Sequence, residues 1–217
     1  LNAEHPFTVV MGGAKLEDKI KVIEKLLPLC DHLLLTGGIA NTFLKALNIN
    51  IGFSLCSYDE ELIEKIKQIL LQYRSKIVLP FDAIVGSSYD KEYTSLKMIN
   101  KLDDNEIIYD LGHKTIEKYS IYLNESQTVF INGTAGKYED PRYANGTKEI
   151  LAALNYSGAN VIVGGGDCVA AVNKFNYKDA FTYLCTGGGA SLDYIANGSL
   201  IALEPLKKEE NYEVLDF

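Results

Sequence analysis

A repeated order of apolar strand, glycine turn and helix constrains the fold of this chain more than any other feature. Five apolar runs end in glycine-bearing turns, at Gly12-Gly13, Gly37-Gly38, Gly133, Gly164–Gly166 and Gly187–Gly189. Strands that are apolar throughout are typical of a parallel sheet buried between two layers of helices. Open parallel sheets bind their ligands beyond the carboxyl ends of the strands, where these glycines fall. The order therefore predicts an α/β domain with a ligand site at one edge.

We expect a three-layer, Rossmann-like domain with a mainly parallel sheet of about six strands and helices on both faces. Between residues 82 and 111 the pattern changes to short alternating segments, which predict a small antiparallel excursion. Apolar spacing at Leu16, Ile20, Ile23 and Leu27 predicts a first helix over residues 15–30. No linker-like tract divides the sequence, so we expect one domain over residues 1–217.

Composition excludes several classes of function. The net charge of -8 argues against a broad nucleic-acid surface, which requires a basic face. No apolar run reaches the ~18 residues of a membrane span. The four cysteines form no CxxC pair and are interpreted as reduced thiols. We therefore expect a cytoplasmic protein that binds neither nucleic acid nor membrane. We also expect a monomer.

Two common nucleotide-binding fingerprints do not fit. The third glycine of GxGxxG would fall at Val169 after the first triple glycine and at Leu192 after the second. In "GTAGKY", a Walker A reading would place its first glycine at Ile131 and its Ser/Thr at Tyr138. The sequence thus predicts neither an ordinary Rossmann dehydrogenase nor a P-loop NTPase.

The glycine turns and nearby charges have two interpretations each. The glycines either let backbone approach a phosphate ligand or simply form tight turns. Lys15 and Lys19, four residues apart on the predicted first helix, either bind an anion or form a solvated face. Asp167 is either the N-cap of the next helix or a ligand of Mg²⁺. Glu139 either accepts ribose hydroxyls or is only solvated.

Several segments together resemble one family, phosphoglycerate kinase, in their order and spacing. They are "GGAKLEDKI" (12–20), "LLTGGIANTFLKA" (34–46), "NG" with "YE" (132–133 and 138–139), "GTK" (146–148), "IVGGGDCVAAV" (162–172) and "TGGGASLD" (186–193). The match covers nearly the whole chain but only the C-terminal half of the family. The resemblance implies a nucleotide-binding domain over residues 1–217, with the N-terminal glycerate-binding domain absent.

The implied activity is that of a phosphotransferase with a carboxyl group as acceptor. It moves a phosphoryl group between 1,3-bisphosphoglycerate and MgADP, giving 3-phosphoglycerate and ATP in glycolysis. This chain alone is expected to be inactive, because the glycerate would bind only through the missing domain. The alternative is a non-catalytic ADP/ATP-binding module, or a folding unit without turnover.

The resemblance also implies roles for individual residues. Lys15 and Lys19 would contact the phosphates and the phosphoryl in transfer, Asp167 would bind Mg²⁺, and Glu139 would border the ribose. Catalytic roles are expected for Lys15, Lys19, Gly166 and Gly189. Nucleotide-binding roles are expected for Gly12, Lys15, Lys19, Gly37, Gly38, Gly112, Asn132, Glu139, Gly165, Gly166, Asp167 and Cys168.

The sequence departs from the family pattern mainly around the base. Thr134 replaces a proline that packs by the base, and Lys137 replaces an apolar residue at the pocket wall. His113, Cys168 and Asp193 also differ from the residues usual in the family. The departures predict that nucleotide affinity and base preference are altered more than the chemistry.

Overall fold

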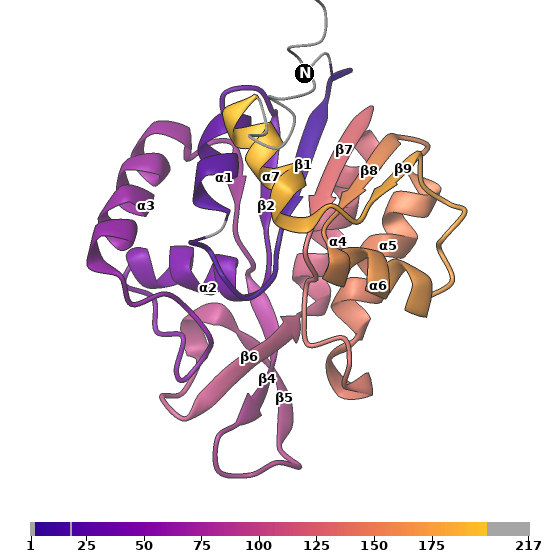
Figure 1. The fold of residues 1–217 in the computed structure, drawn as a ribbon. Coiled ribbons are helices and arrows are strands. Elements are labelled where there is room, and N and C mark those ends of the chain that lie inside the picture. The colour runs from indigo at the N-terminus through magenta and orange to yellow at the C-terminus, as the bar shows by residue number, and fades with distance from the viewer. Residues whose placement is uncertain (1–2, 18, 199–217) are drawn as a thin grey trace, which may run out of the picture.

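Six parallel strands form the central sheet of the computed structural model, which describes residues 3–198 apart from residue 18 (Figure 1). Their order is β3-β2-β1-β7-β8-β9, and every neighbouring pair is parallel. The strands are β1 (Phe7–Met11), β2 (His32–Leu35), β3 (Ile77–Val78), β7 (Thr128–Asn132), β8 (Asn160–Gly164) and β9 (Tyr183–Cys185). The predicted parallel sheet of about six strands is confirmed.

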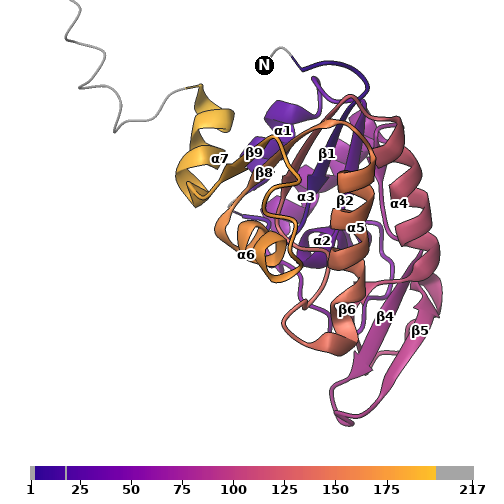
Figure 2. The same ribbon diagram turned by 90° about the vertical axis from the view of Figure 1, so that its right-hand side faces the viewer.

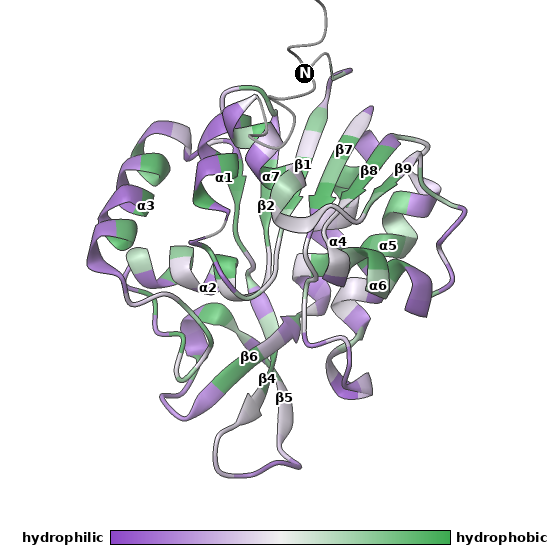
Figure 3. Cartoon of the chain, in the orientation of Figure 1, coloured by the Kyte–Doolittle hydropathy of each residue, from purple (hydrophilic) through white to green (hydrophobic). Residues whose placement is uncertain are grey.

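Helices cover both faces of this sheet, so the predicted three layers are also confirmed (Figure 2). Val9 and Met11 pack into one hydrophobic cluster and Val10 into the other, because successive side chains of a strand point to opposite faces. The first cluster lies under α1 (Ile20–Leu26), α2 (Gly37–Ala46), α3 (Glu60–Tyr73) and α7 (Gly188–Asn197). The second lies under α4 (His113–Glu125), α5 (Asn145–Tyr156) and α6 (Gly166–Lys174). Figure 3 shows the apolar strands and the polar outer side of α3.

The predicted antiparallel excursion is a separate three-stranded sheet. It contains β4 (Asp82–Ser87), β5 (Thr94–Met98) and β6 (Glu106–Leu111) in the order β5-β4-β6. Its inner face packs with Leu44 of α2 through Ala83 and Val85. Short 3₁₀ turns follow β5 at Ile99–Lys101 and precede α5 at Pro141–Tyr143. Figure 1 shows this small sheet below the carboxyl edge of the main sheet.

The predicted start of the first helix is wrong. Helix α1 begins at Ile20, with Lys19 as its N-cap, rather than at Lys15. Leu16 has the helical spacing because its side chain is buried in the same core as Ile20, but it lies in the preceding turn. The backbone N–H groups of Lys19 and Ile20 both donate to the Leu16 carbonyl oxygen. Lys15 and Lys19 therefore do not share a helix face.

The domain predicted over residues 1–217 extends past the described residues at both ends, since residues 1–2 and 199–217 lie outside them. Within the described part, no helix is long and apolar enough to span a membrane.

Candidate functional site at the carboxyl edge of the sheet

The glycine turns come together because the strands end in register. Met11 of β1 pairs with Asn132 of β7, which pairs with Gly164 of β8, which pairs with Cys185 of β9. On the other side, Met11 pairs with Leu35 of β2. All five predicted turns therefore leave the sheet along one edge, where a ligand could contact several of them.

Packing explains some of these glycines. Gly133 has φ +91°, and a Cβ added there would collide with the carbonyl oxygen of Gly12. A Cβ on Gly12 would in turn collide with Thr36 and the Thr134 carbonyl oxygen. The backbone of the β1 and β7 turns is this close because Gly12 N–H donates to the Asn132 carbonyl oxygen at 2.8 Å. At these positions the tight-turn interpretation is sufficient.

Packing does not explain Gly166 and Gly189. Neither has a positive φ, and a Cβ added to either would meet nothing within 4 Å. Both residues instead line a cavity at the sheet edge. Small residues that neither the backbone nor the packing requires keep that space open, which favours the ligand interpretation of these two turns.

This space, called here the polar cavity, has a volume of about 480 Å³. The N-terminal turns of α6 and α7 both border it, and the first N–H groups of a helix have no partner within the helix. Its lining residues are Glu17, Lys19, Lys21, Asn132, Gly133, Gly165, Gly166, Asp167, Cys168, Gly188, Gly189, Leu192 and Asp193.

Asn132 presents a buried donor at the wall of the polar cavity. Its residue is only 2% exposed, and Nδ2 has no hydrogen-bond partner among the described residues. A Cβ added to Gly164 or Gly165 would lie 3.1 Å from this nitrogen, so the two glycines leave it room. A buried N–H group without an acceptor costs free energy, which a ligand with acceptor oxygens would recover.

Of the two lysines predicted to bind phosphates, Lys19 lines the polar cavity and Lys15 does not. Lys19 Nζ donates to the Gly12 carbonyl oxygen at 2.6 Å, which holds the ammonium group between the β1 turn and the cavity. Lys21, which was not among the predicted site residues, also lines the cavity. Lys15 is exposed and lines neither this cavity nor the one described below.

Asp167 does not cap its helix. The N-cap of α6 is Gly165, and Asp167 lies within the first turn, so the N-cap interpretation is wrong. The side chain is exposed, and no group in the described part of the chain donates a hydrogen bond to it. An acidic side chain in the first turn interacts favourably with the helix dipole. Glu17 and Asp193 bring two further carboxylates to the same cavity.

Cys168 lines the polar cavity, but its thiol is buried. The residue is 2% exposed and packs in the cluster beneath α5 and α6. Burial raises the pKa of the Cys168 thiol to about 12, so the thiol stays protonated and is no candidate nucleophile.

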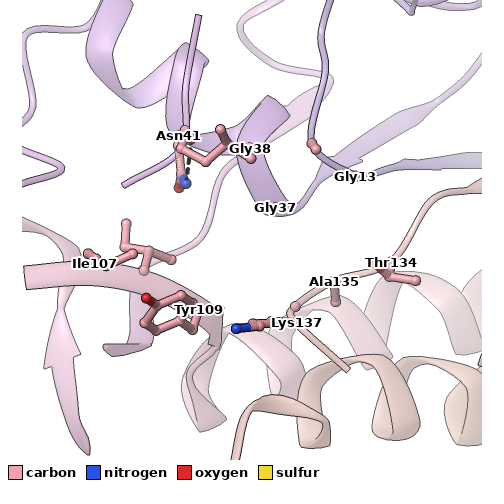
Figure 4. A pocket seen from close by; sticks show the side chains of 13 residues that line it. Gly13, Gly37, Gly38, Asn41, Ile107, Tyr109, Thr134, Ala135 and Lys137 are labelled. Carbon is pink, nitrogen blue, oxygen red and sulfur yellow. Dashed lines mark hydrogen bonds between the residues drawn. The ribbon is translucent and has the colours of Figure 1, made fainter. Parts of the chain in front are cut away.

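A second, apolar cavity of about 270 Å³ lies between α2 and β6 (Figure 4). On the wall opposite α2, Lys137 Nζ lies 5.6 Å from the centre of the Tyr109 ring. The two cavities adjoin, because Gly133 lines the polar one and Thr134 the apolar one. The lining residues of the apolar cavity are Gly13, Ala14, Gly37, Gly38, Asn41, Leu55, Ile107, Ile108, Tyr109, Thr134, Ala135, Gly136 and Lys137.

Three other predicted residues line neither cavity. Gly12 lies in the wall near both, with its oxygen held by Lys19. Gly112 packs against the Asp82 carboxyl group, where a Cβ would collide. Glu139 is exposed beyond the lining segment 134–137.

Some residues of the apolar cavity come from the small sheet and from the segment before α3, and the sequence did not predict them. Ile107, Ile108 and Tyr109 belong to β6, and Leu55 precedes α3. No spacing pattern links these segments to the glycine turns, so only the fold brings them to the site.

The fold and this edge define an open three-layer α/β protein with a ligand cleft at the carboxyl ends of a parallel sheet. The family model for phosphoglycerate kinase matches residues 1–198, and the chain belongs to this family. The phosphoglycerate kinase of Lactobacillus delbrueckii subsp. bulgaricus is 41% identical over 200 residues, covering 92% of this chain and 49% of the relative. That of Wigglesworthia glossinidia brevipalpis is 39% identical over 213 residues, covering 97% and 53%.

Solved structures agree with this assignment. Phosphoglycerate kinase from Coxiella burnetii superposes with a TM-score of 0.87 at 37% identity, covering 94% of this chain and 54% of that one. The enzyme from Pyrococcus horikoshii OT3 gives a TM-score of 0.82 at 28% identity, covering 95% and 53%. The chain thus spans about half the length of the relatives it matches.

Proposed function

We propose that this chain is the nucleotide-binding half of a phosphoglycerate kinase and binds MgADP and MgATP. In the proposed glycolytic reaction, a phosphoryl group moves reversibly between the carboxyl group of 1,3-bisphosphoglycerate and ADP. The observation that carries the proposal is the pair of adjoining cavities, one apolar and one polar with the unpaired Asn132 amide. Family membership supports the use of ADP and ATP.

The base would enter the apolar cavity and the phosphates the polar one. An apolar slot between α2 and β6 suits a flat purine ring, since burial of its faces is favourable. The phosphates would pass the backbone of Gly133 to reach Asn132 and the first turn of α6. Helix N-termini bind phosphate through free N–H groups and the helix dipole.

Phosphoryl transfer depends mostly on positioning and on stabilising charge. Lys19 would place a positive charge beside the transferred group. Asn132 Nδ2, which is fully buried behind Gly164 and Gly165, would donate to a phosphate oxygen only after that turn moves. The open N–H groups at Gly166 and Gly189 would donate from two helices toward the same space. Such fixed donors stabilise developing negative charge without reorganisation during the reaction. Lys15, which is exposed outside both cavities, would act only after the adjoining segment moves.

The residues present fit a magnesium ion that arrives with the nucleotide. Mg²⁺ in such sites is held by one or two carboxylates together with substrate phosphates. Asp167 offers an exposed carboxylate that accepts no hydrogen bond from the described residues. The described residues contain no group of three or more His, Cys, Asp or Glu side chains that could hold a metal by themselves. Bound Mg²⁺ would neutralise part of the phosphate charge.

Cysteine chemistry supports a cytoplasmic location for the proposed enzyme. All four cysteines, Cys30, Cys56, Cys168 and Cys185, lie in the described part of the chain, and none is in a disulfide. Free thiols are typical of proteins in reducing compartments.

Calorimetric titration with ADP, in Mg²⁺ and in EDTA, tests the proposal. We expect saturable binding of ADP, tighter with Mg²⁺, and weaker binding of adenosine, which lacks the groups for the polar cavity. A coupled turnover assay with 3-phosphoglycerate and MgATP should give no product from this chain alone. Absence of both binding heat and a thermal shift with millimolar ADP would refute the assignment, whereas turnover would refute only the expected inactivity.

A further inference from the structure

Asn41 places a fixed polar group in the otherwise apolar cavity. It lies on α2 and is only 3% exposed, although it lines the cavity. Its Nδ2 donates to the Leu55 carbonyl oxygen at 3.0 Å. Figure 4 shows the amide pointing from α2 toward Ile107 and Tyr109 on the opposite wall.

The hydrogen bond to Leu55 fixes which way the Asn41 amide faces. A carbonyl oxygen can only accept, so the amide nitrogen must face Leu55 and Oδ1 must face elsewhere. A flip would lose this bond and place two oxygen atoms against each other. The amide is therefore an acceptor toward the cavity rather than an adaptable donor or acceptor.

Oδ1 of Asn41 is free to receive a ligand donor. No described group donates a hydrogen bond to it. Among the described residues, the fully buried side-chain atoms without a hydrogen-bond partner are Asp110 Oδ1 and Asn132 Nδ2, and Asn41 Oδ1 is not one of them. Asn41 Oδ1 is therefore unpaired but not fully buried, and it faces the cavity that Asn41 lines.

We propose that Asn41 selects the base of the nucleotide, with Oδ1 accepting a hydrogen bond from the exocyclic amino group of a 6-amino purine. This inference rests on the proposed function, because it concerns the base that enters the same site. A 6-oxo purine would bring an oxygen acceptor to Oδ1, leaving both unpaired. A site that hydrogen-bonds one substrate group discriminates strongly against an analogue lacking it, since a buried polar atom is then unsatisfied.

The test compares three nucleotides that differ at position 6 of the purine. Purine riboside 5′-diphosphate lacks the amino group of ADP and replaces it with hydrogen, while inosine 5′-diphosphate carries oxygen there. For the unaltered chain, calorimetry should show that each analogue binds about tenfold more weakly than ADP, which is the loss of one good hydrogen bond. This comparison requires no variant and therefore no assumption about folding.

The variant Asn41→Leu assigns the effect to this residue. It keeps the same branched shape and removes the acceptor, so the affinities for ADP and the two analogues should converge to within about twofold. Asn155→Leu, on the exposed side of α5, is the matched control and should keep the discrimination of the unaltered chain. Thermal unfolding shows whether each variant is folded before titration.

The outcomes separate the two proposals. If ADP binds to the unaltered chain but either analogue binds equally well, the role of Asn41 is refuted and the nucleotide site stands. Retained discrimination in folded Asn41→Leu would likewise refute it. If none of the three nucleotides binds, the proposed function fails, and the role of Asn41 fails with it.

Discussion

Asp110 of β6 accepts a 2.7 Å hydrogen bond from the backbone N–H of Gly146, in the first turn of α5. The N-cap of α5 is Ala144, which has no capping side chain, so a carboxyl group from the small sheet takes that place. A Cβ on Gly136 or Gly146 would collide with Asp110 Oδ1. The contact thus holds the small sheet, α5 and the segment that lines the apolar cavity together.

This carboxyl group should make stability depend on pH. Asp110 is 1% exposed, its Oδ1 has no partner among the described residues, and burial raises its pKa from 3.8 to about 7. The folded state then keeps the proton up to about pH 7, whereas the unfolded chain releases it near pH 4. Because the folded state binds more protons in this window, its stability falls as pH rises through it.

Asp110→Asn should remove that dependence, because asparagine cannot ionise. Urea unfolding at pH 5 and pH 8 measures this effect. Between these two pH values, the free energy of unfolding of the unaltered chain should fall by about 2–3 kcal/mol relative to that of the variant. A difference between the two proteins that is the same at both pH values would show that Asp110 is already ionised at pH 5.

Asp82, on β4, differs from Asp110 because its carboxyl group is fully hydrogen-bonded. Its carboxylate accepts hydrogen bonds from the backbone N–H groups of Lys114 and Thr115 and from Thr115 Oγ1, at the start of α4. No atom of this buried side chain is left unpaired. Asp82→Asn replaces an acceptor by a donor facing other donors, so it should destabilise the chain by about 1–3 kcal/mol near pH 7. Urea unfolding of Asp82→Asn and Asp110→Asn at pH 7 compares their free energies of unfolding. Equal destabilisation by the two substitutions would contradict this prediction.

Gly166→Ala and Gly189→Ala should weaken nucleotide binding without weakening the fold. Neither glycine has a positive φ or a close neighbour, so alanine should leave stability unchanged or raise it by up to about 1 kcal/mol. The new methyl groups would occupy the polar cavity and reduce ADP affinity several-fold.

Gly133→Ala is the control for these two substitutions. Its φ of +91° and the nearby Gly12 oxygen make alanine strained, so unfolding should occur at clearly lower urea concentration. Unchanged ADP affinity in both Gly166→Ala and Gly189→Ala would mean that these turns do not contact the ligand.

The sequence predicted those features that depend on neighbouring residues. The apolar strands, their glycine turns and the short alternating segments each carry a local pattern, and the sheet and its edge followed from them. Leu16 shows the limit, because a buried residue one turn before Ile20 has the same spacing as a helical one. Periodicity reports which side chains are buried, not where the backbone begins to be helical.

The rest of the site depends on contacts between distant segments. Asn41 and Tyr109 lie on opposite walls of one cavity, and nothing in their local sequences indicates that they meet. In the sequence, Asp82 and Asp110 look like ordinary acidic residues of a polar stretch. Both are buried because the small sheet packs against the starts of two helices. Such roles follow only from the tertiary fold.

The carboxylate of Asp167 is proposed to bind the magnesium ion of MgADP. Because Gly165 is the N-cap of α6, Asp167→Asn removes no cap and should change stability by less than about 1 kcal/mol, mainly through the helix dipole. Asparagine is a poorer ligand for Mg²⁺ than a carboxylate. The variant should therefore bind MgADP more weakly, while metal-free ADP binds equally well or better, since one negative charge facing the phosphates is gone. Calorimetry in Mg²⁺ and in EDTA gives the ratio of the two affinities.

Asp179→Asn, exposed after α6 and outside both cavities, is the matched control and should keep the ratio of the unaltered chain. The same ratio in Asp167→Asn would leave Asp167 with a purely electrostatic role in its helix.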